Sequence, residues 1–118
     1  MKPHNIYIGK QGEQIAEEYF IKNNCEILEK NFRAGHGEID LIVKENDTIL
    51  FVEVKTRTNT NFGTPIESIT EKKINILKET ANRYLFEKNF ETFEYRFDFI
   101  GIKLKKTTFE LSHIKNCF

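Results

Sequence analysis

The middle of the chain, from Gly37 to Arg57, reads GEIDLIVKENDTILFVEVKTR. Two apolar runs of strand length flank a polar cluster, which favours a β-hairpin that turns at Asn46 and Asp47. Charged side chains are costly inside strands unless they leave the core or find partners. Four of them nevertheless stand inside the two runs: Glu38, Asp40, Glu53 and Lys55.

The turn predicts how the two strands pair. A loop of even length centred on Asn46 and Asp47 sets Asp40 opposite Glu53 and Glu38 opposite Lys55. We therefore expect one face of the hairpin to be core and the other to be a charged cluster. The apolar pairs predicted on the core face are Ile39 with Val54, Leu41 with Val52, and Val43 with Leu50.

The predicted pair of Asp40 and Glu53 points to a divalent cation. Two carboxylates directly opposite each other in a sheet repel unless a cation lies between them. Oxygen ligands without His or Cys nearby favour Mg²⁺ or Mn²⁺ over zinc. Lys55 projects to the same side as Glu53, where its ammonium can steady an attacking water or the charge on a phosphoryl group.

Plainer interpretations of the same residues stay open at this point. Asp40, Glu53 and Lys55 can also form a salt-bridge cluster on a solvated sheet face, where ion pairs contribute little. Glu38 either orients Lys55 or makes an ordinary ion pair with it.

The rest of the chain predicts two helices and three further strands. Apolar residues at helical spacing indicate a helix from about Ile6 to Asn23. The second helix follows a polar loop over 58–65, and two capping signatures compete for its start. Its predicted core face is Ile74, Leu77, Ala81, Tyr84 and Leu85, the capping signatures are Thr64–Glu67 and Ser68–Glu71, and the further strands are 26–33, 93–102 and 108–114.

This order, helix, three strands, helix, two strands, predicts an α/β fold: a mixed β-sheet flanked by helices, in order αβββαββ. We expect one domain over residues 1–118, because no linker, repeat or low-complexity tract divides the chain.

The composition limits the classes of partner. Eighteen basic and eighteen acidic residues cancel, so any contact with a polyanion must be local. Cys25 and Cys117 lie far apart without partner histidines, which argues against a zinc site or a disulfide framework and fits a reducing cytoplasm. No export signal and no long apolar run are present, so we expect a cytoplasmic protein without a membrane partner.

The motif residues resemble a known group of nucleases. An acidic residue on one strand followed by Glu-x-Lys on the next, here Asp40 and Glu53-Val54-Lys55, resembles the signature of the PD-(D/E)xK superfamily, which has the restriction-endonuclease-like fold. Ile39 stands where the motif's proline would be. Nearly the whole chain is similar to the YraN-type family of small uncharacterised bacterial proteins, through Gly9-x-x-Gly12-Glu13, Ala16, Asn31-x-Arg33, Gly37–Ile42, Phe51–Arg57, Phe62-Gly63, Lys73, Ala81 and Arg96-Phe-Asp98.

The resemblance implies roles for individual residues. Asp40, Glu53 and the backbone carbonyl of Val54 would be metal ligands, and Lys55 would be the catalytic lysine. Glu13 matches a glutamate that archaeal Holliday junction resolvases add from their first helix, so it would be a supporting ligand, often through water. Resolvases of this fold act on branched DNA as dimers, which implies DNA rather than RNA as the substrate and a homodimer as the assembly.

Other polar residues carry weaker predictions. Lys73 either contacts a substrate phosphate or lays its stem over apolar neighbours. Arg57 and the loop after it are placed to line a substrate groove, and Phe62 in that loop either stacks on a base or plugs the core. For Arg96 and Asp98 we favour an internal salt bridge.

The sequence thus predicts a Mg²⁺- or Mn²⁺-dependent nuclease that hydrolyses phosphodiester bonds in nucleic acid, with DNA, including branched DNA, the favoured substrate. The alternative is a catalytically quiet module that keeps the nuclease fold and binds nucleic acid or a protein. Zero net charge favours the second interpretation, and the complete motif favours the first.

Overall fold

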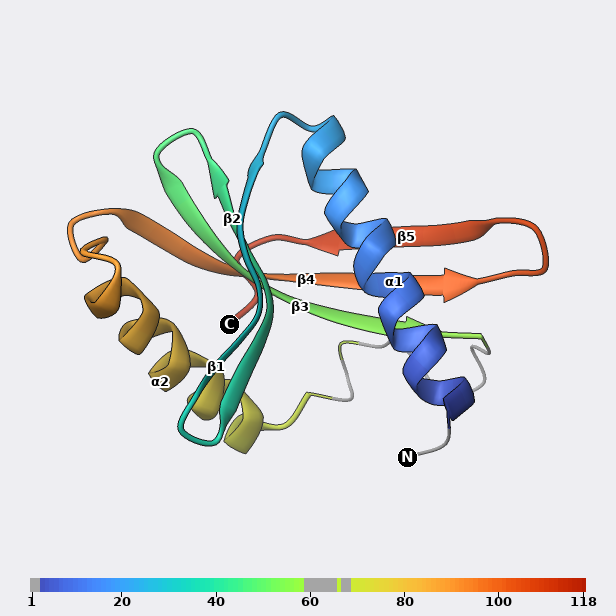
Figure 1. The fold of residues 1–118 in the computed structure, drawn as a ribbon, viewed down its shortest axis with the longest axis horizontal. Coiled ribbons are helices and arrows are strands. Elements are labelled where there is room, and N and C mark those ends of the chain that lie inside the picture. Colours follow the sequence, from blue (N-terminus) through green and yellow to red (C-terminus); the bar gives the residue numbers. More distant parts are fainter. Residues whose placement is uncertain (1–2, 59–65, 67–68) are drawn as a thin grey trace.

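The structure is a computed structural model that describes residues 3–58, 66 and 69–118, with side chains from residue 7 onward. The described residues form two helices and five strands in the predicted order (Figure 1). Neither helix combines the length and the apolar character needed to cross a membrane. The elements are α1 (Pro3–Lys22), β1 (Glu26–Ala34), β2 (Gly37–Glu45), β3 (Thr48–Arg57), α2 (Glu71–Glu87), β4 (Glu94–Leu104) and β5 (Phe109–Ile114).

The described strands form a single mixed sheet in the order β1-β2-β3-β4-β5. All neighbours pair antiparallel except β3 and β4, which are parallel and joined through α2. A parallel pair needs such a crossover because its strands start at the same edge of the sheet. The arrangement confirms the predicted α/β class and is compatible with the restriction-endonuclease-like fold.

Both faces of the sheet are apolar, which corrects the prediction of one core face and one charged face. On the first face, Ala16 and Phe20 of α1 pack on alternate residues of the strands. On the second face, Leu77, Ala81 and Tyr84 of α2 pack on the intervening residues. The two helices therefore cover opposite faces of the sheet.

The alternation of β2 slips by one residue at Asp40. Ile39 belongs to the cluster under α2, whereas Leu41 belongs to the cluster under α1, although residues two apart in a strand normally share a face. The prediction that Ile39 shares a face with Leu41 is therefore wrong. Across from Asp40 on β1 lies Asn31, whose φ of 52° is left-handed and which makes no ladder pair between Lys30↔Leu41 and Phe32↔Ile39.

Helix α2 begins at neither predicted cap. Thr70 is the N-cap, with an extended backbone, and its hydroxyl accepts a hydrogen bond from the Lys73 N–H at 3.1 Å. Residues 64 and 65 of the first predicted signature lie outside the described residues. The predicted core face of α2 is confirmed at Leu77, Ala81, Tyr84 and Leu85, while Ile74 is half-buried and Thr80 is also buried.

Candidate active site

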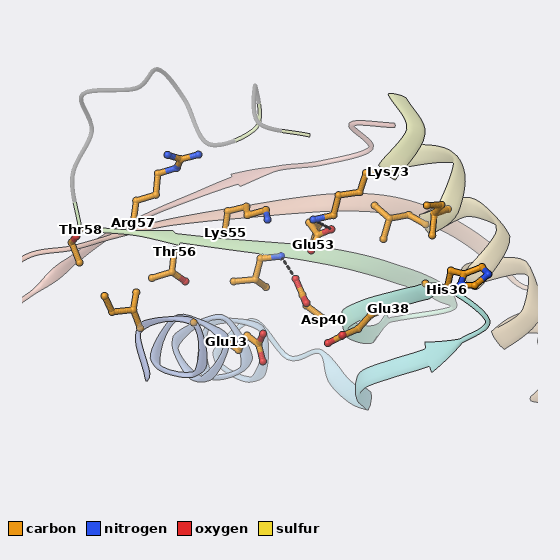
Figure 2. Close-up of a pocket in the computed structure, with 16 residues that line it drawn as sticks. Glu13, His36, Glu38, Asp40, Glu53, Lys55, Thr56, Arg57, Thr58 and Lys73 are labelled. Atoms are coloured by element: carbon orange, nitrogen blue, oxygen red, sulfur yellow. Dashed lines mark hydrogen bonds and ion pairs between the residues drawn. The ribbon is translucent and has the colours of Figure 1, made fainter. Parts of the chain in front are cut away.

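A groove of about 790 Å³ lies where α1, β2, β3 and the start of α2 meet (Figure 2). Every described residue for which the sequence predicts a role in the metal site or in substrate binding lines this groove, which brings together positions far apart in the chain. They are Glu13, Glu38, Asp40, Glu53, Val54, Lys55, Arg57 and Lys73.

The groove opens because β2 and β3 stop pairing there. The predicted register is confirmed at Val43↔Leu50 and Leu41↔Val52, where the described ladder ends. The predicted ladder pairs of Asp40 with Glu53 and of Glu38 with Lys55 are absent from it. Instead, the Val54 N–H donates a hydrogen bond to Asp40 Oδ2 at 2.8 Å, so a side chain replaces the backbone partner.

Alternation along β3 then distributes the polar side chains. Figure 2 shows Glu53, Lys55 and Lys73 on one side of β3 and Glu13 on the other, with Asp40 between the two groups. Because β2 slips at Asp40, this carboxylate meets residues from both sides of the sheet, a placement that regular alternation forbids.

Glu53 is the most buried charged residue of the groove, with 6% of its surface exposed. Its Oε2 lies 3.5 Å from Lys73 Nζ, an ion pair by distance. This oxygen nevertheless makes no hydrogen bond to any residue that the structure describes. A buried carboxylate oxygen of this kind is costly and invites a further positive ligand.

Asp40 has an unusually weak acid group. Burial, then contact with the Glu53 carboxylate, raises its pKa to about 8, against the lowering effect of the Val54 N–H. Below that pH, Asp40 therefore keeps its proton beside the Glu53 carboxylate.

The two lysines of the groove titrate in opposite directions. Burial and the nearby Lys73 ammonium lower the pKa of Lys55. Burial also opposes the charge of Lys73, but the Glu53 carboxylate outweighs it, so the pKa of Lys73 is raised. Lys73 is therefore the counter-ion of Glu53, and Lys55 is the better proton acceptor of the pair.

Glu13 reaches the groove from α1. Burial and the Asp40 charge raise the pKa of its carboxyl group. The helix can lie this close because Gly12 faces Thr56 of β3, where a Cβ would collide with the threonine side chain.

Asn31 is the neighbour of Glu13 that the sequence interpretation missed. When its amide nitrogen faces the carboxylates, Asn31 lies 3.1 Å from Glu38 Oε1 and 3.3 Å from Glu13 Oε1. A polar asparagine in mid-strand is an available signal, because this residue type disfavours strands and tolerates left-handed φ.

Glu38 does not pair with Lys55 as predicted. Its carboxylate forms an ion pair with Arg33 of β1, with 3.2 Å between Oε2 and Nε, and both side chains are at least partly exposed. Glu38 therefore acts, with Asn31, on the Glu13 side of the groove, because β2 has turned away from β3 at this point.

Arg57 extends the groove along β3. Its side chain is half-buried, and its buried Nε has no hydrogen-bond partner among the residues that the structure describes. The predicted role of Phe62 lies outside the described residues.

The residues present fit a hard divalent cation. In the described part of the chain, no three Asp, Glu, His or Cys side chains are grouped around one point. By the resemblance, Asp40, Glu53 and the Val54 carbonyl would be the direct protein ligands, and Glu13 a supporting ligand through water. This sparse set suits Mg²⁺ or Mn²⁺, which one or two carboxylates hold while waters and substrate phosphate complete the shell. It does not suit structural zinc, which needs four protein ligands.

Comparison with known proteins identifies relatives over most of the sequence. Residues 12–102 match a family described as "Uncharacterised protein family UPF0102". A UPF0102 protein of Caldanaerobacter subterraneus subsp. tengcongensis is 43% identical over 94% of this chain and 93% of its own length. The corresponding proteins of Syntrophomonas wolfei (41% over 97% of this chain and 99% of its own) and Clostridium beijerinckii (40% over 100% and 98%) are similar over almost the full length.

Proposed function

The chain belongs to the uncharacterised protein family UPF0102, and we propose that it is a nuclease that hydrolyses phosphodiester bonds in DNA with Mg²⁺ or Mn²⁺. The resemblance to the PD-(D/E)xK nucleases supports this proposal at Asp40, Glu53 and Lys55. Zero net charge is compatible with it because Lys55, Arg57 and Lys73 supply positive charge locally, beside the carboxylates of the groove.

One observation carries the proposal: two carboxylates, Asp40 and Glu53, are withdrawn from solvent together at the point where β2 and β3 separate. The plainer interpretation of these residues is an ion pair on a solvated face, where water would complete the hydrogen bonds of each carboxylate. Glu53 Oε2 differs, because it is buried and has no hydrogen-bond partner among the described residues. A divalent cation removes both the repulsion and the unmet hydrogen-bonding capacity.

The groups around the carboxylates suit phosphodiester hydrolysis. When bound, Mg²⁺ or Mn²⁺ supplies positive charge to the scissile phosphate and lowers the pKa of a water nucleophile. Lys55, with its lowered pKa, can accept a proton from the attacking water. Lys73 and Arg57 bring fixed positive charge to the phosphate that undergoes attack.

The first test is thermal melting with Mn²⁺ or Mg²⁺ at millimolar concentration. We expect the wild-type protein to melt at a higher temperature with the cation, because a ligand at about 100 times its Kd stabilises the folded state by about 2.7 kcal/mol. Asp40→Asn and Glu53→Gln should lose this increase. Glu18→Gln is the matched control at an exposed position of α1, and it should keep the increase.

The second test is cleavage of linear, supercoiled, flapped and four-way DNA, with RNA of the same sequences. We expect Mn²⁺-dependent cleavage of at least one DNA substrate. Lys55→Ala should retain the metal-dependent rise in melting temperature, because the lysine is not a metal ligand. It should lose cleavage, because Lys55 accepts the proton of the attacking water.

The rival function, a catalytically quiet binding module, predicts a different result. Lys73 already neutralises Glu53 in part, so a quiet module would melt at the same temperature with and without the cation. If the wild type and Asp40→Asn melt alike at every metal concentration, the nuclease proposal is wrong. A homodimer belongs to the same proposal by analogy with resolvases, and sedimentation of the full chain tests it.

A further inference from the structure

A second groove, next to the candidate active site, has the chemistry of a nucleic-acid binding surface. It has a volume of about 700 Å³ and lies between the first turns of α1 and the turn that joins β4 to β5. Ile8 and Thr58 line both this groove and the active-site groove, so the two grooves adjoin. We call it the β4–β5 groove, and it is lined by Tyr7, Ile8, Gln11, Thr58 and 103–106.

The charge of the β4–β5 groove departs from that of the whole protein. The chain has no net charge, yet three of the four residues 103–106 are lysines. Glu110 lies 4.0 Å from Lys103 and 3.3 Å from Lys105 and is itself largely exposed, and none of the described residues that line the groove is acidic. The local charge therefore stays positive, as a surface that binds phosphates requires.

An exposed aromatic side chain accompanies the lysines. Tyr7 is 68% exposed and stands on α1 beside the lysines of the turn. A lone exposed aromatic residue needs no explanation, but one beside clustered lysines forms the usual platform for an unpaired base. Duplex DNA keeps its bases stacked on one another and has no free face to offer Tyr7, so the aromatic residue favours a single strand.

The order of the residues suggests a path for the strand. Along β3, Figure 2 places Glu53, Lys55, Arg57 and Thr58 in succession from the two carboxylates outward. Arg57 has a buried Nε without a described hydrogen-bond partner, and Thr58 already lines the second groove.

We propose that the DNA strand cleaved at Asp40 and Glu53 continues as a single strand past Arg57 into the β4–β5 groove, where Lys105 and Lys106 bind its phosphates and Tyr7 stacks on a base. This inference rests on the proposed nuclease function and gives it a substrate class: DNA with an unpaired segment next to the scissile phosphate.

The test measures binding, not cleavage. Fluorescence anisotropy in EDTA uses three labelled probes: a blunt duplex, the same duplex with a single-stranded tail, and the single strand alone. We expect the tailed and single-stranded probes to bind at least tenfold more tightly than the blunt duplex. The doubly substituted Lys105→Glu/Lys106→Glu protein should bind the tailed probe at least tenfold more weakly, with a log–log salt slope about 1.4 units shallower, the value for two phosphate contacts on a single strand.

Matched variants separate the groove from general charge and from loss of folding. Lys78→Glu/Lys88→Glu makes the same charge change at exposed positions on and just after α2, and it should leave binding within twofold. Tyr7→Ala should weaken tailed DNA about tenfold, a usual effect of losing one stacked base, and leave the blunt duplex unchanged. Phe86→Ala, which removes an aromatic side chain that is 70% exposed on α2, should change neither.

Three results would overturn the inference: equal weakening by the two lysine pairs, wild-type affinity of Tyr7→Ala for tailed DNA, or absence of binding by the wild type to all three probes. Thermal melting with Mn²⁺ tests cation binding at Asp40 and Glu53 without DNA. If the protein binds the cation but fails the DNA-binding tests, the inference about the β4–β5 groove is wrong and the proposed metal site still stands.

Discussion

Asp40 on β2 and Asp98 on β4 are two carboxylates withdrawn into the same sheet, and their surroundings are opposite. Asp98 is fully buried, and its oxygens accept hydrogen bonds from Arg96 at 2.9 and 3.1 Å, from His113 Nε2 at 2.8 Å and from the Asn116 N–H at 3.0 Å. Burial alone would raise the pKa of Asp98, but His113 and Arg96 outweigh it and lower the pKa to about 2.

Asp40 accepts one hydrogen bond, from the Val54 N–H, and lies next to a second carboxylate, that of Glu53. Burial and Glu53 raise its pKa to about 8, whereas that of Asp98 is about 2, so the pKa values of the two aspartates lie on opposite sides of the usual value. Asp98 has all the partners it needs, which marks it as a structural anchor for β4, β5 and the following segment. Asp40 lacks them, and such unmet groups concentrate at functional sites.

The largest expected effect on stability comes from replacing Asp98, the carboxylate with a full set of hydrogen bonds. Asp98→Ala leaves Arg96 Nε and His113 Nε2 without their buried hydrogen-bond acceptor, so we expect it to lower the free energy of unfolding by about 3 kcal/mol. Asp40→Ala should cost less, about 1 kcal/mol, because it removes the acceptor of one backbone hydrogen bond, that of the Val54 N–H. Urea denaturation at pH 7 without divalent cations measures both. Equal losses would mean that the two sites do not differ as their hydrogen bonds indicate.

The surroundings of Asp40 also depend on how closely α1 lies on β3. Gly12→Ala puts a methyl group into Thr56, and we expect a loss of about 2 kcal/mol together with displacement of Glu13 from the groove. Gly9→Ala is the control on the same helix, since a Cβ there meets no atom within 4 Å. It should be neutral or slightly stabilising because alanine favours helix. A stable Gly12→Ala protein with unchanged Mn²⁺ binding would contradict this account.

The two aspartates should give stability opposite pH dependences. Folded Asp40 keeps its proton up to about pH 8, whereas the unfolded chain releases it near pH 4, so its contribution is present below pH 4 and lost as the pH rises to about 8. Asp98 is ionised in the folded protein down to about pH 2, so its contribution is present above pH 4 and lost as the pH falls to about 2.

Between pH 5 and 8, the wild-type protein should therefore lose at least about 1 kcal/mol of stability, less than the equivalent of one pKa unit. Asp40→Asn should not show this loss. Denaturation at several pH values without divalent cations measures this decrease for the wild type and the variant. Parallel pH profiles of the two proteins over this range would show that Asp40 titrates like an exposed carboxyl group.

The smallest expected effect concerns Asn31. Asn31→Gly keeps the left-handed backbone but removes the amide that faces Glu13 and Glu38. We expect stability within about 0.5 kcal/mol of wild type and an approximately threefold weaker Mn²⁺ affinity, below the tenfold loss typical for partners of direct ligands. Calorimetric titration with Mn²⁺ measures it. An unchanged affinity would mean that Asn31 only provides the left-handed backbone conformation and that its amide does not support the site.

Local patterns predicted most of the elements. The hairpin turn, the helical spacing in α1 and α2 and the salt bridge between Arg96 and Asp98 follow from neighbours in the sequence, and the structure confirms them. The helix start at Thr70 was missed because Thr and Ser at three nearby positions offer similar hydroxyls, and only packing selects among them. The ion pair between Lys73 and Glu53 was missed for a related reason, because sequence spacing cannot predict which residues of α2 reach β3.

The sequence by itself determined which side chains the site can use: a carboxylate on one strand and Glu-x-Lys on the next. The way these residues meet came from tertiary packing. A left-handed Asn31 and a slip in β2 bring Asp40 between the two faces of the sheet, and Gly12 lets α1 deliver Glu13. Side-chain periodicity is a property of one strand, whereas where a strand breaks its alternation depends on everything packed against it.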